Sequence, residues 1–183
     1  LRIHATLKAK TPLHVGGHSD RLDLDMPLAV NGRGEFYIPG TSLAGVLRAW
    51  MERHLDAVDV DLLKLWGFQQ GERGAASRVL VEDAVVTLPA GLSDELWDGV
   101  GIDRQWGSAA RTIKFDRSIL PRDTTFPLDL SVELPPEHEK PFQAAFGHLL
   151  QAVKEDGLVL GAAGTRGLGR LSLEGLSIRR EDW

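Results

Sequence analysis

Two amphipathic helical segments, each lying between segments of strand-like alternation, restrict the folds that this chain can adopt. Apolar residues recur at helical spacing in 43–50 and again in 142–153. Polar and apolar residues alternate in 1–10 and most clearly in 126–134, as in half-buried strands. Further strands are predicted at 36–38, 78–87 and 171–176. The order β, α, β, insertion, β, α, β is that of a ferredoxin-like α+β fold, with two helices on one face of a four-stranded antiparallel sheet, and RNA-recognition motifs share it.

Capping and turn residues set the predicted ends of the smaller elements. Thr41 or Ser42 is the predicted N-cap of the first helix, which runs to about Leu55. A second, short helix is predicted at 59–66. The segment 68–77 is polar and glycine-rich, so the sequence predicts a loop there.

The segment 88–122 has no clean period. So long a non-periodic stretch inside a compact domain is usually functional. Within 101–122 basic residues outnumber the acidic Asp103 and Asp116: they are Arg104, Arg111, Lys114, Arg117 and Arg122. A local patch of this kind can steer a polyanion even when the whole chain is acidic.

Length and composition exclude several classes of protein. A chain of 183 residues suits one domain, and its net charge of −5 argues against binding nucleic acid with the whole surface. The absence of cysteine excludes disulfides, thiol catalysis and Cys-ligated zinc. The lack of cysteine also fits a cytoplasmic protein, and no run is long and apolar enough to span a bilayer, so we expect no membrane partner. Because the first residue is Leu1, we also expect a processed chain or part of a longer one.

The segment 161–170, GAAGTRGLGR, combines four glycines with two arginines and has no acidic residue. Glycine accepts positive φ, and successive N–H groups in such a turn converge into an anion-binding concavity. Arg166 and Arg170 add planar donors suited to phosphate, which favours a phosphate cradle over a flexible connection. In that case the segment lies beside the sheet, with the first and last strands adjacent. A Walker loop is excluded because no Gly-Lys-Ser/Thr follows.

Five sequence motifs occur in the order found in the RAMP superfamily. They are LHVGG at 13–17, IPGTSLAGVLR at 38–48, LWG at 65–67, RVLVEDA at 78–84 and GTRGLGR at 164–170. The chain most resembles the Cas7-like backbone subunits of type III CRISPR effectors, of the Csm3 and Cmr4 kind. The resemblance implies a single RAMP domain over 1–183, with an RRM-like palm and a β-hairpin thumb inserted at about 88–122.

In such proteins, copies or homologous domains line up along a guide RNA, and the thumb interrupts pairing between guide and target. The resemblance therefore implies guide RNA, target RNA and other Cas subunits or neighbouring Cas7-like domains as partners. Arg104, Arg111 and Lys114 would lie near RNA, whereas a solvated loop surface is the alternative. The glycine segment would contact RNA through Gly164, Thr165, Arg166, Gly167 and Arg170.

The start of the first predicted helix is a second candidate contact. The N-terminus of a helix carries unpaired N–H groups and a partial positive charge, and so binds phosphate. Ser42 and Arg48 are candidates to meet the guide backbone, although ordinary capping also accounts for Ser42.

The sharpest prediction concerns Asp25. Target-cleaving relatives carry an essential aspartate between the first Gly-Gly pair and the Ile-Pro-Gly motif, and Asp25 matches that position. A carboxylate can act as the base when the RNA 2′-OH attacks the adjacent phosphorus, or can hold Mg²⁺ near the phosphate. Asp25 is therefore predicted to make the chain an endoribonuclease that cleaves guide-bound target RNA. In the alternative, Asp20, Asp23 and Asp25 are solvated loop acids and the chain only binds RNA.

Histidines suggest a third function. His14 and His18 are four residues apart, but Gly16 and Gly17 make a helix, and hence a zinc pair, a poor prediction. Cas6-like relatives that process precursor guide RNA use a histidine as general base, which His14, His18 or His54 could supply.

Three tryptophans could stack on bases. Trp97 and Trp106 are the better candidates, whereas Trp66 is predicted to be in the core. An unrelated ferredoxin-like metabolic domain remains the alternative to every RNA-binding function.

Overall fold

The computed structural model describes residues 1–17, 24–55 and 60–181, with the backbone alone in 109–113. Its main sheet is antiparallel and five-stranded, in the order β10–β11–β1–β9–β5. These strands are β1 (Arg2–Ala9), β5 (Val79–Val81), β9 (Thr125–Val132), β10 (Leu158–Val159) and β11 (Arg170–Arg179). The strands β1 and β11 pair with each other, so the first and last long strands are adjacent, as the sequence predicts.

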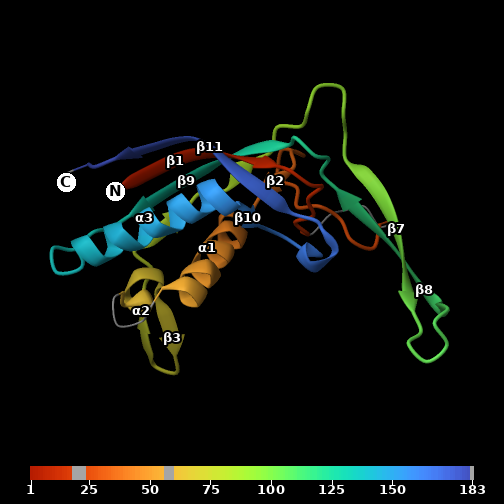
Figure 1. Ribbon diagram of the computed structural model, residues 1–183, viewed down its shortest axis with the longest axis horizontal. Helices are drawn as coiled ribbons and strands as arrows, with labels where there is room; N and C mark the ends of the chain where they lie inside the picture. Colours follow the sequence, from red (N-terminus) through yellow and green to blue (C-terminus); the bar gives the residue numbers. More distant parts are fainter. Residues whose placement is uncertain (18–23, 56–59, 182–183) are drawn as a thin grey trace.

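Two long helices cover one face of this sheet. Figure 1 shows α1 (Gly40–His54) and α3 (Glu139–Asp156) on the same side of β1, β9 and β11. Alternate residues of β9 point to the helices and are buried, whereas those between them are partly exposed. The strict alternation in 126–134 and the helical spacing in 142–153 therefore predicted these elements correctly.

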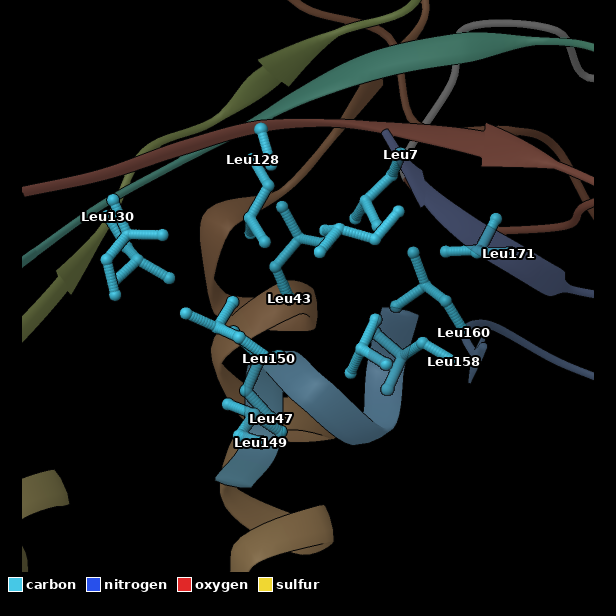
Figure 2. Packing of buried hydrophobic residues seen from close by; sticks show 14 of the residues in the cluster. Leu7, Leu43, Leu47, Leu128, Leu130, Leu149, Leu150, Leu158, Leu160 and Leu171 are labelled. Atoms are coloured by element: carbon cyan, nitrogen blue, oxygen red, sulfur yellow. The ribbon is translucent and has the colours of Figure 1, made fainter. Parts of the chain in front are cut away.

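Leucines from the sheet and from both helices form the core. Figure 2 shows Leu7 and Leu128 of the sheet pointing toward Leu43 of α1, with Leu150 of α3 nearby. Full burial of one such side chain stabilises the folded state by roughly 1.5–3 kcal/mol. Packing in the core thus fixes the strands and helices relative to each other, and hence the positions of the loops that connect them.

Two predicted boundaries near α1 are wrong. The helix begins at Gly40 with Pro39 as N-cap, so neither Thr41 nor Ser42 caps it. The short helix α2 (Leu62–Trp66) begins later than predicted because the side chain of Asp61 caps it, accepting from the Lys64 N–H at 3.1 Å.

The segment predicted as a loop at 68–77 forms a small ribbon of β3 (Phe68–Gln70) and β4 (Arg73–Ala75). The ribbon is largely exposed, so its strands need no apolar alternation, and Gly71 makes the turn with φ of +60°. A second short pair joins β2 (Tyr37–Ile38) to β6 (Ala84–Val85).

A long hairpin extends away from the sheet (Figure 1). It consists of β7 (Glu95–Ile102) and β8 (Ala109–Ile119) and falls within the segment predicted to be an insertion. Only its base is anchored, by the buried Ile119 and the following Leu120. Its exposed apolar side chains are Leu96, Trp97, Val100, Ile102 and Trp106. Within the described part of the chain, no helix is long and apolar enough to cross a membrane.

Candidate functional site

Asp25 lies at the base of the β7–β8 hairpin. Its side chain is held by backbone, because Oδ2 accepts from the Asp116 N–H at 3.0 Å. The next residue joins the same ladder: the Met26 N–H donates to the Asp116 carbonyl at 3.0 Å, and the Ser118 N–H donates to the Met26 carbonyl at 3.1 Å. Asp25 itself is exposed, so the carboxylate has a fixed position that solvent can reach.

His14 connects this base to the glycine segment. Its ring is buried, and Nδ1 lies 2.7 Å from the Ser118 carbonyl oxygen, which can only accept, so Nδ1 carries the hydrogen. Burial lowers the pKa of His14 and the charge of Arg117 lowers it further, while the bond to Ser118 opposes them. The His14 carbonyl accepts from the Ala162 N–H at 2.9 Å.

The glycine segment packs so closely that two of its positions admit only glycine. Gly161 has φ of +83°, and a Cβ there would lie 2.1 Å from the His14 carbonyl oxygen. Gly169 has φ of +76°, and a Cβ there would lie 2.0 Å from the Leu160 carbonyl oxygen. The Gly169 N–H also donates to the Pro12 carbonyl at 2.8 Å. The segment is therefore docked at the end of β1.

The middle of this segment faces solvent. It contains the single turn η1 (Gly164–Arg166), preceded by Ala163 in the left-handed conformation with φ of 60°. The N–H groups of Ala163, Gly164 and Thr165 have no hydrogen-bond acceptor within the described part of the chain. Thr165, Arg166, Gly167 and Arg170 are exposed. Bare amides next to two exposed guanidinium groups are suited to binding an anion.

The predicted contacts on the hairpin lie further from this base. Arg104 is exposed in the hairpin turn, and Lys114 is exposed on β8, with Nζ 3.3 Å from Oδ2 of Asp98. Arg111 lies in β8, but its side chain is outside the described part of the structure. Trp106 is 76% exposed.

The start of α1 is organised differently from the prediction. The Gly40 N–H donates to Oδ1 of Asp83 at 2.7 Å, so a carboxylate already occupies the helix N-terminus. A Cβ at Gly40 would lie 2.2 Å from the Val81 carbonyl oxygen, which explains the glycine at this position. The Ser42 N–H donates to the Pro39 carbonyl at 2.9 Å.

Arg48 braces α1. Its Nε donates to Glu52 at 2.7 Å and its Nη1 donates to the Gly67 carbonyl at 3.3 Å. No hydrogen bond or ion pair among the described residues joins Ser42 or Arg48 to Asp25. The structure therefore places Asp25 at the hairpin base, which His14 links to the glycine segment.

Three residues of β8 complete the site, although no sequence motif marks them. Arg117 is 8% exposed and lies against the Phe115 ring, 5.7 Å from its centroid, with Nη2 3.3 Å from the Met26 sulfur. Ser118 supplies the acceptor for His14. Asp116 lies directly opposite Asp98 in the hairpin. The sequence prediction considered only the basic residues of this segment and therefore missed Asp116.

The remaining predicted groups have other surroundings. His18, Asp20 and Asp23 lie outside the described residues. His54 stacks on Trp50 with ring centroids 4.5 Å apart, at the end of α1.

Trp66 is buried against Phe146, as the core prediction requires. Among the described residues, no three His, Cys, Asp or Glu side chains form a group suited to a metal ion.

Fold and site together define a mixed α/β protein in which His14 links an exposed segment rich in glycine and arginine to the base of a projecting hairpin. The sequence model of the RAMP superfamily matches residues 6–172, and the chain belongs to that superfamily.

Two solved structures share the fold. A chain of a type III-B Cmr-beta complex bound to cognate target RNA has a TM-score of 0.71 at 13% identity, over 95% of this chain and 96% of that chain. A chain of the apo state of type III-B Cmr-beta has a TM-score of 0.72 at 15% identity, with the same coverage of 95% and 96%. No curated protein matches the sequence.

Proposed function

We propose that this chain is a Cas7-like, RNA-binding subunit or domain of a type III CRISPR ribonucleoprotein. It binds guide RNA at the glycine segment and positions complementary target RNA with the hairpin, which serves as the thumb within 88–122. Its partners are guide RNA, target RNA and other Cas subunits or neighbouring Cas7-like domains. The observation that carries the proposal is the solvent-facing turn at 163–165, whose backbone N–H groups have no acceptor among the described residues. Arg166 follows these N–H groups in the chain, and the bond from Ala162 to the His14 carbonyl precedes them.

Two further observations support the proposal. The order β11–β1–β9–β5, with α1 and α3 on one face, matches the strand order expected of a ferredoxin-like palm. The similar chains come from complexes named type III-B Cmr-beta, one of them bound to cognate target RNA.

Asp25 gives the subunit a means to cleave the target. One carboxylate oxygen is fixed by the Asp116 N–H, and Oδ1 has no partner within the described residues. Oδ1 takes the proton of the RNA 2′-OH, the 2′-oxygen attacks the adjacent phosphorus, and the 5′-oxygen leaves. Positioning supplies much of the acceleration when the RNA is held in line, so one base suffices for this proton transfer.

Mg²⁺ has a limited place in this reaction. Asp25 would supply one carboxylate ligand to an ion that also binds phosphate oxygens of the RNA. A Mg²⁺ requirement stays a prediction, and cleavage assays with EDTA check it.

The test combines RNA content with cleavage. The purified complex should contain RNA whose sequences share a common repeat, and it should cut RNA complementary to that guide. Asp25→Asn keeps an acceptor for the Asp116 N–H but removes the charge, so we expect loss of cleavage with the same guide content. The matched control is Asp123→Asn, a change at an exposed aspartate paired with Lys8, which should cut normally. Cleavage that persists in Asp25→Asn contradicts the catalytic assignment, and a complex free of RNA contradicts the whole proposal.

The second candidate is a subunit that binds RNA without cutting it. The exposed glycine segment favours this function even if Asp25 is inactive.

A Cas6-like processing enzyme is less well supported, because His14 is buried and hydrogen-bonded, and His54 stacks on Trp50. Cutting of repeat RNA by the isolated chain without divalent ions is the result that supports this third function.

A further inference from the structure

A pair of carboxyl groups lies beside Asp25 at the base of the hairpin. Asp98 of β7 and Asp116 of β8 are directly opposite each other in the antiparallel ladder. Side chains at such positions are close enough to interact, and like charges there are unfavourable. Lys114 on β8 approaches Asp98, with Nζ 3.3 Å from Oδ2. Asp25 also contacts this pair, because its Oδ2 accepts from the Asp116 N–H.

These surroundings place one proton on Asp116. A hydrogen bond between two carboxyl groups requires a proton on one of them, and that proton also removes the repulsion between the facing pair. Lys114 favours the charged form of Asp98. Oδ1 of Asp116 is buried and has no hydrogen-bond partner among the described residues, which disfavours a negative charge on it.

The pKa directions agree with this geometry. The bond to Asp98 raises the pKa of Asp116, with desolvation and the charges of Asp98 and Asp25 adding to it and Lys114 opposing. The bond to Asp116 and the contact with Lys114 lower the pKa of Asp98. A carboxyl group whose pKa is raised keeps its proton to higher pH and can therefore donate it as a general acid. A phosphodiester anion arriving beside Asp116 will disfavour its ionised form further.

We propose that Asp116 is the general acid of the RNA cleavage proposed above, with Asp25 as its general base. The inference rests on the proposed function of Asp25. Asp25 takes the proton from the 2′-OH as the 2′-oxygen bonds to phosphorus. Asp116 gives its proton to the 5′-oxygen as the P–O5′ bond breaks. The products are a 2′,3′-cyclic phosphate and a 5′-hydroxyl, and a proton moving from Asp25 to Asp116 through water restores both groups.

The test uses a leaving group that needs no acid. The assembled complex cuts two target RNAs, one natural and one with sulfur in place of the bridging 5′-oxygen at the scissile phosphate. Asp116→Asn should slow cleavage of the natural RNA about 100-fold or more and leave the sulfur RNA nearly unchanged, because thiolate leaves unprotonated. The backbone N–H that holds Asp25 is retained in this variant. Asp25→Asn should slow both RNAs.

A second variant keeps the proposal testable if Asp116→Asn does not assemble. Asp98→Asn removes the negative neighbour, so the pKa of Asp116 falls. The rate with natural RNA should then decline at lower pH than in the unchanged complex, and the sulfur RNA should not show this shift. Equal slowing of both RNAs by Asp116→Asn, or an unshifted pH profile in Asp98→Asn, overturns the general-acid role and leaves cleavage by Asp25 intact. If the unchanged complex cuts neither RNA, the cleavage proposal fails and Asp116 has no reaction to serve.

Discussion

His14 shows how one residue can join distant segments of this chain. Its ring hydrogen bonds to the Ser118 carbonyl at the hairpin base, and its own carbonyl accepts from the Ala162 N–H. The second contact requires the backbone of the glycine segment to pass within van der Waals distance of His14. Only a residue without Cβ can take that position, so Gly161 is a packing requirement as well as a turn residue.

Gly161→Ala should therefore destabilise the protein. The left-handed φ of +83° alone costs about 1–3 kcal/mol for a residue with Cβ, and the contact with the His14 carbonyl adds to it. The matched control is Gly45→Ala in α1, where a Cβ meets no atom within 4 Å and a better helix former should stabilise by roughly 0.5–1 kcal/mol. Urea unfolding of the two variants measures both changes. Equal stability of Gly161→Ala and the unchanged protein contradicts the close approach to His14.

At the scale of elements, two motifs that lie far apart in the sequence form one structure. The helix α1 starts against β5, and Asp83 after β5 accepts from the Gly40 N–H at 2.7 Å. The strands β2 and β6 pair beside this contact. The Ile-Pro-Gly motif and the RVLVEDA motif are thus one helix-capping arrangement.

Asp83→Ala should lower the free energy of unfolding by about 1 kcal/mol, the usual effect of removing an N-cap acceptor. The matched control is Glu82→Ala, because Glu82 is exposed and its contact to β9 uses its backbone N–H. Thermal unfolding of both variants gives the comparison. An equal loss of stability in Glu82→Ala would mean that Asp83 and Glu82 both act through their negative charge, and that the hydrogen bond from Gly40 to Asp83 is not what matters.

The same elements show what the sequence could and could not predict. The strand at 126–134 and the helix at 142–153 were predicted correctly because burial on one face repeats at a fixed period. The cap of α1 was predicted wrongly because its acceptor, Asp83, lies 43 residues away in sequence. Asp116 was missed for a similar reason: only the register of β7 and β8 places it opposite Asp98. The sequence pattern alone could thus predict periodic strands and helices, but it could not predict which distant segments pair with each other.

At the scale of the whole molecule, net charge and local charge point in opposite directions. The chain carries a net charge of −5, which opposes the approach of RNA over most of its surface. Under the proposed function, RNA should therefore bind where exposed basic groups have no carboxylate partner among the described residues, and Arg166 and Arg170 are such groups. Arg48 is not, because its guanidinium pairs with Glu52.

This difference predicts how salt affects RNA binding. Removing one cation that neutralises a phosphate should reduce the slope of log affinity against log salt by about 0.7 for a single strand, so Arg166→Ala and Arg170→Ala should each reduce it by that amount. Arg48→Ala is the matched control: it removes the same charge from a group already paired with Glu52 and bonded to Gly67, so the slope should stay the same. Titrations of single-stranded RNA at several salt concentrations measure all three. A larger change in slope for Arg48→Ala than for Arg166→Ala would contradict this prediction. It would indicate that RNA contacts the start of α1 and not the glycine segment, because only a guanidinium that neutralises a phosphate releases counterions.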